Sequence, residues 1–356
     1  MTFASSAFIA SQDVRRAAYD GTGRQAITRN QGSEPITIDA EQLSRLRRYE
    51  APESEIYEEF LERRVGRGGA FALLAGPLGA PRDEGWIVCP SIGPEHGNLR
   101  RLEAIVARTL AKAGYPVLRL RPDVDPVDGL RVEIDLAARL HEVEDAVRTM
   151  TDDVGARSVG VLGSFFGATA AALACEQLAL REMVLIEPVA RGKAYLKEIM
   201  RRHAVAELVG TVDEHGPDGA AAQQQETAAP REQLAAEGHA ALQGMGLSRA
   251  EAERIAAVDL VGDLRSFDGR SLLVGISPSG ALSPSLARLR DHLASLGGQV
   301  ATTVVEDPLF APFGEYYFRN AGPVRVDTRL GLDERVASTI AAWAIGRTAD
   351  APVAAT

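Results

Sequence analysis

Short apolar runs that alternate with helical stretches are the feature that most restricts the fold of this 356-residue chain. The runs are too short for helices and are bounded by turn residues, as buried strands are. They are Ala70–Leu74, Trp86–Cys89, Val117–Leu120, Val159–Leu162, Val184–Ile186, Leu272–Ile276 and Val300–Val305. Residues 99–113 and 133–150, between three of these runs, repeat their apolar positions with helical spacing. This alternation predicts an α/β fold with a mostly parallel central sheet flanked by helices.

The same pattern divides the chain into three parts. Residues 1–53 are polar and form an N-terminal extension, with one short strand at Ile36–Ile38 and one helix from Glu41. Residues 54–188 and 266–348 carry the alternating pattern and form the core.

Residues 189–265 interrupt the pattern. No strand is evident between Pro188 and Phe267, and helices are expected over about 193–209, 231–243 and 248–257. Ser248 with Glu251 three residues later predicts a capping box for the last helix. We therefore expect a helical cap inserted over the carboxyl edge of the sheet.

Composition limits the partners. The net charge is −10 and the 39 Lys and Arg residues are scattered, which favours a small-molecule substrate over nucleic acid or a membrane. No run approaches the roughly 18 apolar residues that a membrane span requires. Cys89 and Cys175 lie in apolar sequence, which favours a reduced, cytoplasmic setting. Metal-ligand spacings and nucleotide or flavin fingerprints are absent, so no metal or cofactor is expected. The sequence leaves open whether the protein forms a homodimer.

The segment SVGVLGSFFGATAAALA, residues 158–174, is the most informative motif. An apolar strand enters a turn bracketed by Gly163 and Gly167 and continues into a helix of small residues. In proteins with a G-x-S-x-G elbow, such a strand, turn and helix present the nucleophile at the central position of the turn. The central residue of this elbow is Phe165, which has no nucleophilic atom.

The order of these elements resembles the α/β-hydrolase superfamily. Several segments resemble its serine-aminopeptidase-like branch, which includes the hydrolases associated with exosortase systems. They are VCPSIGPEHGNLRR (88–101), LAKAGYPVLRL (110–120), VLIEPVARGKAYLKE (184–198) and GMGLSRAEAERIAAVDL (244–260). The resemblance covers roughly residues 56–345 and implies an α/β-hydrolase fold with an inserted helical cap.

The sequence departs from this family where the catalytic triad belongs. The acid of the family follows the seventh strand, where this chain has Ser277, Pro278, Ser279 and Gly280. The histidine follows the eighth strand, but residues 306–330 contain no histidine. With Phe165 at the elbow, all three triad positions lack their usual residue. Without a nucleophile, little acyl-enzyme chemistry is expected.

Three residues are the catalytic candidates. His96, in the loop after the third strand of the family, is either a general base or a solvated surface residue. Glu187 ends the sixth strand and is either a base or a partner of Arg191 or nearby backbone. Ser164 is a nucleophile only if the elbow is shifted by one residue; otherwise it packs beneath the elbow.

The substrate is expected to meet the same loop, the elbow and the cap. The loop at Pro90–Asn98 and the backbone N–H of Phe166 are candidates for an oxyanion hole. Tyr195 either packs at the cap hinge or bonds the substrate, and Phe166 is either core or pocket wall. The candidate substrate-binding residues are Ser91, Ile92, Glu95, Phe165, Phe166 and Tyr195.

Three functions fit these residues. The first is a lyase that eliminates a carboxylate such as acetate from an acylated intermediate of secondary-metabolite or antibiotic biosynthesis. In its overall layout and its lack of the usual triad residues, the sequence resembles the acetate-eliminating enzymes of spirotetronate pathways. The second is an ester or thioester hydrolase, or an acyltransferase, that uses Ser164. The third is a catalytically silent protein that binds a ligand.

Overall fold

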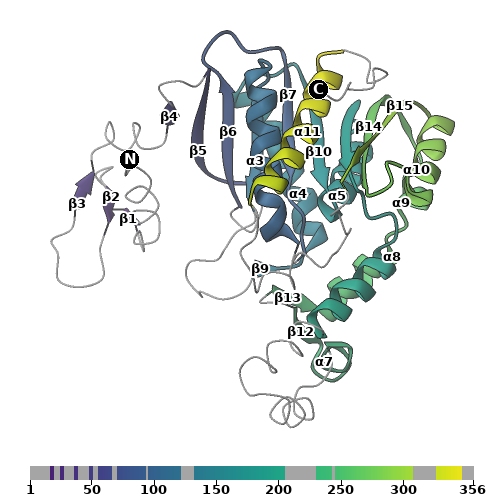
Figure 1. Cartoon of the computed structure of the whole chain (residues 1–356). Coiled ribbons are helices and arrows are strands. Elements are labelled where there is room, and N and C mark those ends of the chain that lie inside the picture. The colour runs from purple at the N-terminus through teal and green to yellow at the C-terminus, as the bar shows by residue number, and fades with distance from the viewer. Residues whose placement is uncertain are drawn as a thin grey trace.

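A nine-stranded sheet forms the centre of the computed structural model, which describes residues 17–19, 25–27, 36–38, 48–50, 55–65, 70–93, 95–121, 132–204, 230–242, 245–307 and 326–346 (Figure 1). The strand order is β15-β14-β11-β10-β7-β8-β6-β5-β4. From β15 to β8 the neighbouring strands pair parallel, whereas β6, β5 and β4 each pair antiparallel with the preceding neighbour. The strands span Arg48–Glu50 (β4), Ile56–Val65 (β5), Ala70–Pro77 (β6), Glu84–Cys89 (β7), Val117–Arg121 (β8), Ser158–Ser164 (β10), Glu182–Ile186 (β11), Phe267–Ser277 (β14) and Gly297–Glu306 (β15).

Every apolar run that predicted a strand lies within one of these strands. Strand β5 was missed because its sequence, IYEEFLERRV, carries charges where a buried strand would alternate. The charges are accommodated because β5 lies near the edge of the sheet. Arg108 of the first core helix donates two hydrogen bonds to the Glu58 carboxylate, at 2.7 and 3.0 Å.

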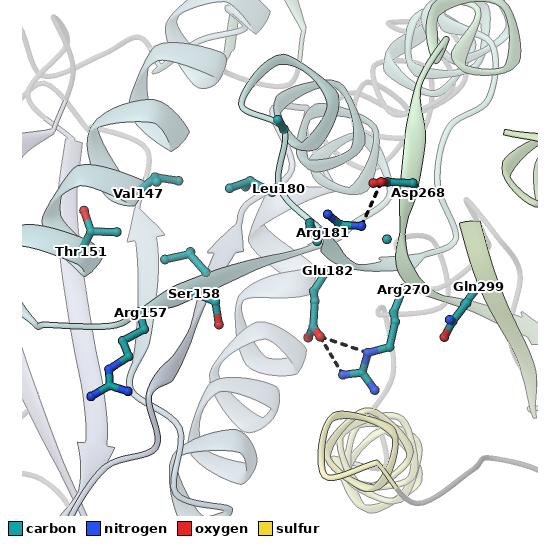
Figure 2. Close-up of a pocket in the computed structure, with 13 residues that line it drawn as sticks. Val147, Thr151, Arg157, Ser158, Leu180, Arg181, Glu182, Asp268, Arg270 and Gln299 are labelled. Carbon is teal, nitrogen blue, oxygen red and sulfur yellow. Dashed lines mark hydrogen bonds and ion pairs between the residues drawn. The ribbon is translucent and has the colours of Figure 1, made fainter. Parts of the chain in front are cut away.

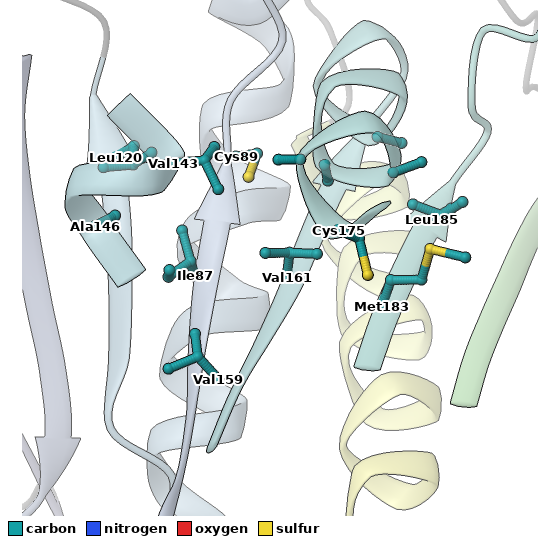
Figure 3. Close-up of a cluster of buried hydrophobic side chains, with 14 of the residues drawn as sticks. Ile87, Cys89, Leu120, Val143, Ala146, Val159, Val161, Cys175, Met183 and Leu185 are labelled. Carbon is teal, nitrogen blue, oxygen red and sulfur yellow. The ribbon is translucent and has the colours of Figure 1, made fainter. Parts of the chain in front are cut away.

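The two faces of the sheet are both covered by helices, as the sequence predicts. Because side chains alternate along a strand, β7 sends Ile87 and Cys89 to one face and Trp86 and Val88 to the other. The first face packs against α4 (Leu136–Arg148) and α5 (Phe166–Gln177), and Figure 3 shows this cluster. The second packs against α3 (His96–Lys112) and α11 (Val326–Ala344).

The helix boundaries follow local signals. Helix α3 ends before Gly114, whose φ of 97° suits glycine, and β8 begins after Pro116. Helix α4 begins later than expected, because Val132–Glu133 forms the short strand β9 and Asp135 caps the helix by accepting the Ala138 N–H at 2.9 Å. A π-helical turn, Thr149–Asp153, extends α4 past its expected end at residue 150.

The segment between β11 and β14 contains helices, as expected, but also two strands. A helix covers residues 192–204, and α7 (Pro230–Glu237), α8 (Arg249–Ala257) and α9 (Leu260–Asp263) follow. The expectation of no strand was wrong, because β12 (His239–Leu242) and β13 (Met245–Ser248) pair antiparallel and β13 also pairs with β9. Four-residue strands are too short to show a period in the sequence. Strand β12 also replaces the end of the helix expected over 231–243.

The capping box at α8 is only half formed. Ser248 Oγ accepts the Glu251 N–H at 3.2 Å, as the motif predicts. The Glu251 carboxylate does not return the bond and instead accepts the Leu136 N–H at 2.6 Å. The reason is burial, because Glu251 faces the first turn of α4, whose amide needs an acceptor. Glu251 thereby ties the inserted segment to the core.

The N-terminal extension holds the expected strand at Ile36–Ile38, which is β3. It pairs with β2 (Gln25–Ile27), which pairs with β1 (Ala17–Tyr19). Strand β4 also comes from this part of the chain. The helix expected from Glu41 lies outside the described residues, and the boundaries of extension, core and cap stay predictions.

The turn between β10 and α5 requires glycine at two positions. A Cβ on Gly163 would lie 2.3 Å from the Gly167 carbonyl oxygen, and one on Gly167 would lie 2.5 Å from that of Cys89. Strand β10, helix α5 and the end of β7 therefore meet backbone to backbone. This elbow and the order of the parallel strands define the α/β-hydrolase fold, and the fold class expected from the sequence is confirmed.

We predict that Gly163→Ala lowers the free energy of unfolding by about 1–3 kcal/mol or more, because the added methyl group meets fixed backbone. Urea denaturation measures the change. Gly79→Ala is the matched control, since nothing lies within 4 Å of its added Cβ, and it is expected to change stability little. Equal stability of the two variants would contradict this account of the elbow.

Candidate functional site

Phe165 occupies the apex of the elbow. Its φ of 51° and ψ of −121° are unusual for a residue with a side chain, and such geometry typically costs about 1–3 kcal/mol. The Phe165 N–H donates to the Ile186 carbonyl at 2.8 Å, which fixes the turn against the neighbouring strand β11. The strained conformation that presents a nucleophile is thus kept, while the side chain at the apex has no reactive atom.

Ser164 lies one residue before the apex, fully buried at the end of β10. Its Oγ donates to Glu103 Oε1 at 3.2 Å. Glu103 projects from α3 and is itself only 3% exposed. The hydroxyl therefore points into the protein beneath the elbow rather than to its surface.

Burial raises the pKa of Glu103 to about 7. Hydrogen bonds from Ser164 and the Ser91 backbone and the charges of Arg119 and Arg139 act in the opposite direction, but burial is the larger effect. Near neutral pH this carboxyl group exists in both protonation states, directly beneath the turn.

A second buried carboxyl group lies in the loop after β7. Glu95 accepts hydrogen bonds from Ser91 Oγ and from the Tyr195 hydroxyl, the latter at 3.0 and 3.1 Å to its two oxygens. Burial raises the pKa of Glu95, while these bonds and the Arg202 charge oppose the rise. The loop and the helix at 192–204 are joined through this one acid.

Tyr195 also explains Gly93. A Cβ on Gly93 would lie 1.7 Å from the Tyr195 hydroxyl oxygen, so only glycine allows the tyrosine to reach Glu95. The ring of Tyr195 packs on Phe166 with centroids 4.7 Å apart. Both rings and Ile92 belong to the apolar cluster between elbow and cap. Five of the six candidate substrate-binding residues thus meet here, and Phe165 adjoins them in sequence.

His96 begins α3 and is partly buried, and its Nδ1 has no hydrogen-bond partner. Burial lowers its pKa to about 4, and the positive charges of Arg100, Arg139, Arg121 and Arg119 lower it further. The imidazole is therefore neutral at physiological pH.

Glu187 directly follows β11, with a φ of 46°. Its Oε1 accepts the backbone N–H of Ile276 in β14, and burial raises its pKa. Because β10 lies between β7 and β11, the topology brings His96 and Glu187 to the carboxyl edge on opposite sides of the elbow.

The turn after β14, where the triad acid is expected, carries serine residues, and most of the segment after β15, where the histidine is expected, lies outside the described residues. In the turn after β14, Ser277 Oγ lies 3.1 Å from Ser279 Oγ. Glu306, the last residue of β15, lies beside this turn, with Oε2 3.6 Å from the Cβ position of Gly280. His292 lies on α10 (Pro284–Ser295), where its Nε2 contacts the Leu264 carbonyl at 2.8 Å.

A cleft of about 580 Å³ lies at the opposite, amino edge of the sheet. Figure 2 shows that charged side chains surround it, with Arg181 paired to Asp268 and Arg270 paired to Glu182. The guanidinium of Arg157, also on its wall, lies 3.2 Å from Asp83. Because these charges neutralise one another, the cleft offers less chemistry than the elbow edge.

Sequence reasoning missed Glu103 and the buried ion pair of Arg139 with Glu142. In both cases the sequence contains a sign of burial. Glu103 shares a helical face with Val106, Ala107 and Leu110, and Arg139 stands between Leu136 and Val143 on the buried face of α4. A charge at such a position is rarely buried without a specific partner.

No protein-family model and no curated protein matches the sequence. Among solved structures, the chain is similar to an esterase from Pyrobaculum calidifontis, with 15% identity over 81% of this chain and 85% of that one, at a TM-score of 0.44. It is also similar to esterases from Rhizomucor miehei (15%, 83% and 85%, TM-score 0.46) and to Est1E from Butyrivibrio proteoclasticus (13%, 83% and 98%, TM-score 0.42). At these values the likeness carries no argument about function.

Two further properties of the described residues concern their helices and their cysteines. None of their helices has both the length and the apolar character needed to cross a bilayer. Cys89 and Cys175 are buried free thiols, and burial raises the pKa of each to about 12.

We predict that the stability of the protein falls as pH rises from about 4.5 to 7 through Glu103. The folded state binds this proton more tightly than the unfolded state, so unfolding becomes easier as the proton leaves, by on the order of 3 kcal/mol. Denaturation curves across this range measure the effect. Glu103→Gln is expected to flatten the dependence, and Glu253→Gln, at an exposed position, to leave it unchanged. Parallel curves for wild type and Glu103→Gln would contradict the prediction.

Proposed function

We propose that this protein is a lyase on an α/β-hydrolase fold, which eliminates a carboxylate such as acetate from an acylated small molecule. The observation that carries the proposal is the elbow. Phe165 stands at its apex, and the adjacent hydroxyl, on Ser164, turns inward to Glu103. A reaction that needs no covalent acyl-enzyme suits this arrangement.

The elimination balances without a cofactor. A base takes the proton from the carbon next to the substrate carbonyl, and the electron pair of that C–H bond forms the C=C bond. The C–O bond to the acyloxy group breaks, and the carboxylate leaves with its electron pair. The products are an unsaturated carbonyl compound and an acid, and the base returns its proton to solvent.

Glu187 is the proposed base. Its Oε1 is held by the Ile276 N–H, which fixes the carboxylate, and its raised pKa makes it a stronger base than an exposed glutamate. His96, neutral because its pKa is lowered to about 4, is better suited to hydrogen-bond the substrate carbonyl than to remove the proton.

The backbone of the elbow adds to the polarisation of the carbonyl. Phe166 begins α5, so its N–H is among the first four amides of a helix and points away from the helix. Such amides stabilise negative charge on a carbonyl oxygen. The loop at Pro90–Asn98 is the second proposed source of donors.

The wider setting is part of the proposal. The resemblance to the exosortase-associated branch and to the acetate-eliminating enzymes of spirotetronate pathways supports a role in secondary metabolism, with a small-molecule substrate. The buried free thiols favour a cytoplasmic location. A homodimer is compatible with this function.

One observation favours a second function, an ester hydrolase or acyltransferase. Ser164 Oγ lies 3.2 Å from Glu103, whose pKa of about 7 allows it to take the hydroxyl proton. Full burial of Ser164 opposes this alternative. A fluorophosphonate probe tests it, since labelling lost in Ser164→Ala would establish Ser164 as the nucleophile.

We predict that the purified protein converts β-acetoxy carbonyl compounds to the unsaturated products and acetate in equal amounts, with no adduct by intact mass. Ser164→Ala is expected to keep activity within about threefold, because its hydroxyl does not meet the substrate. Glu187→Gln is expected to lose at least about 100-fold, the usual contribution of a general base. An acyl adduct on Ser164 would overturn the proposal, and no turnover across the series would favour the silent ligand-binding protein.

The pH dependence provides a further test of Glu187. Because the base must be unprotonated and its pKa is raised, activity is expected to increase with pH through a pKa above that of an ordinary glutamate. His96 stays neutral above its pKa of about 4 and adds no second step near neutrality. Measurement of kcat against pH checks this, and a profile with no acid limb above the usual glutamate range would exclude Glu187 as the base.

A further inference from the structure

One buried carboxyl group, that of Glu95, holds the loop after β7 in place. Ser91 Oγ donates to Glu95 Oε1, and the Tyr195 hydroxyl bonds both Glu95 oxygens, at 3.0 and 3.1 Å. All three residues are less than 9% exposed. Ser91 and Glu95 are four residues apart, so their bond closes the chain between them into a turn. Tyr195 ties this turn to the inserted segment.

Two backbone N–H groups inside this turn, those of Ile92 and Gly93, have no acceptor among the described residues. Both residues are buried. The neighbouring His96 N–H, in contrast, donates to the Gly93 carbonyl at 2.9 Å. Because buried amides are nearly always paired in folded proteins, two adjacent amides without an acceptor are suited to bind an oxygen atom of a ligand.

The turn lies against the first turn of α5. A Cβ on Gly167 would lie 2.7 Å from the Pro90 carbonyl carbon, so the start of the loop touches the helix. A Cβ on Gly93 would lie 1.7 Å from the Tyr195 hydroxyl oxygen. The Tyr195 ring in turn packs on Phe166, with centroids 4.7 Å apart. These contacts join the loop amides to Phe166, whose own N–H begins α5.

We propose that Glu95 and Tyr195 are positioning residues, which hold two loop amides beside the elbow amide of Phe166 as one oxyanion-binding site. The loop amides are those of Ile92 and Gly93. This inference rests on the proposed function, in which the substrate carbonyl oxygen gains negative charge. It differs from the expectation that Glu95 and Tyr195 bind the substrate themselves, because both act through the loop.

The test measures binding of an oxyanion, separately from turnover. The probe is para-nitrophenolate, used above the pKa of its phenol, because its charged oxygen accepts hydrogen bonds from converging N–H groups. Nitrobenzene is the counterpart that lacks this oxygen. NMR of the protein is expected to show saturable downfield shifts of the Ile92, Gly93 and Phe166 amide protons with para-nitrophenolate. Nitrobenzene is expected to cause no downfield shift.

Two variants that each remove one hydroxyl group test the positioning. Tyr195→Phe keeps the aromatic ring but removes its bond to Glu95. Ser91→Ala removes the other hydroxyl. Each is expected to weaken para-nitrophenolate binding about tenfold or more, because displaced donors lose hydrogen-bond geometry. Since both act through the same carboxyl group, the double variant is expected to bind about as weakly as the weaker single variant.

Matched controls separate positioning from general stability. Tyr115→Phe removes another buried hydroxyl, which donates to the Ala344 carbonyl at 2.6 Å in a different apolar cluster. Its affinity for para-nitrophenolate is expected to stay within about twofold of wild type. Glu95→Gln keeps a group that can bond both hydroxyls, and is expected to restore most of the binding that Glu95→Ala loses.

Turnover provides a second measurement. If β-acetoxy carbonyl compounds are substrates, Tyr195→Phe is expected to lower kcat about tenfold or more and to change KM little. The reason is that the carbonyl oxygen carries its full negative charge only near the transition state.

The outcomes separate this inference from the proposed function. No downfield shift of the three amides in wild type, unchanged affinity in both Tyr195→Phe and Ser91→Ala, or an equal loss in Tyr115→Phe would overturn it, even if elimination is observed. Oxyanion binding at these amides that depends on both hydroxyls would support it, even if the β-acetoxy compounds are not turned over.

Discussion

The backbone contact between β10, α5 and the end of β7 is the constraint on which the site depends. Gly163 and Gly167 permit it because a methyl group at either position would overlap a carbonyl group. With the strand and helix this close, the connecting residue has no room for ordinary dihedral angles and takes a φ of 51°. The geometry of a nucleophile elbow is therefore set by its flanking glycines and not by the residue at its apex, which is why a phenylalanine can stand there.

Beneath this contact lies a group of buried acidic and basic side chains. Glu95, Glu103 and Arg139 are each less than 9% exposed; each of the two acids has a partner in a distant part of the chain, whereas Arg139 pairs with Glu142 on the same helix. Glu95 bonds Tyr195, 100 residues away, and Glu103 bonds Ser164, 61 residues away. Each buried charge needs such a partner, because desolvation otherwise outweighs its attraction to neighbours. The polar groups thus fix the loop after β7 relative to the elbow and the cap.

Sequence periodicity was sufficient for seven of the nine strands of the central sheet and for most of the described helices. Buried parallel strands such as Val184–Ile186 are uniformly apolar, and the glycine bracket around Phe165 marks the elbow directly. The sequence did not predict strand β5 or the pair β12 and β13. In β5 the charged residues of a strand near the sheet edge hide the alternation, and β12 and β13 are too short to show one. The contacts of Ser91, Glu95 and Tyr195 escaped for another reason. They join residues distant in sequence, and a single sequence contains no signal for the distance between side chains.

The base of the inserted segment is closed by backbone bonds. The Gly192 N–H donates to Val258, the Leu260 N–H donates to Ala190, and Arg191 bridges to Asp259, while a Cβ on Gly192 would lie 1.7 Å from the Ile255 carbonyl oxygen. The chain thus leaves and re-enters the core at a single point. A change in the length of such a segment leaves the path of the strands unaltered, so the sheet and the segment above it can vary independently.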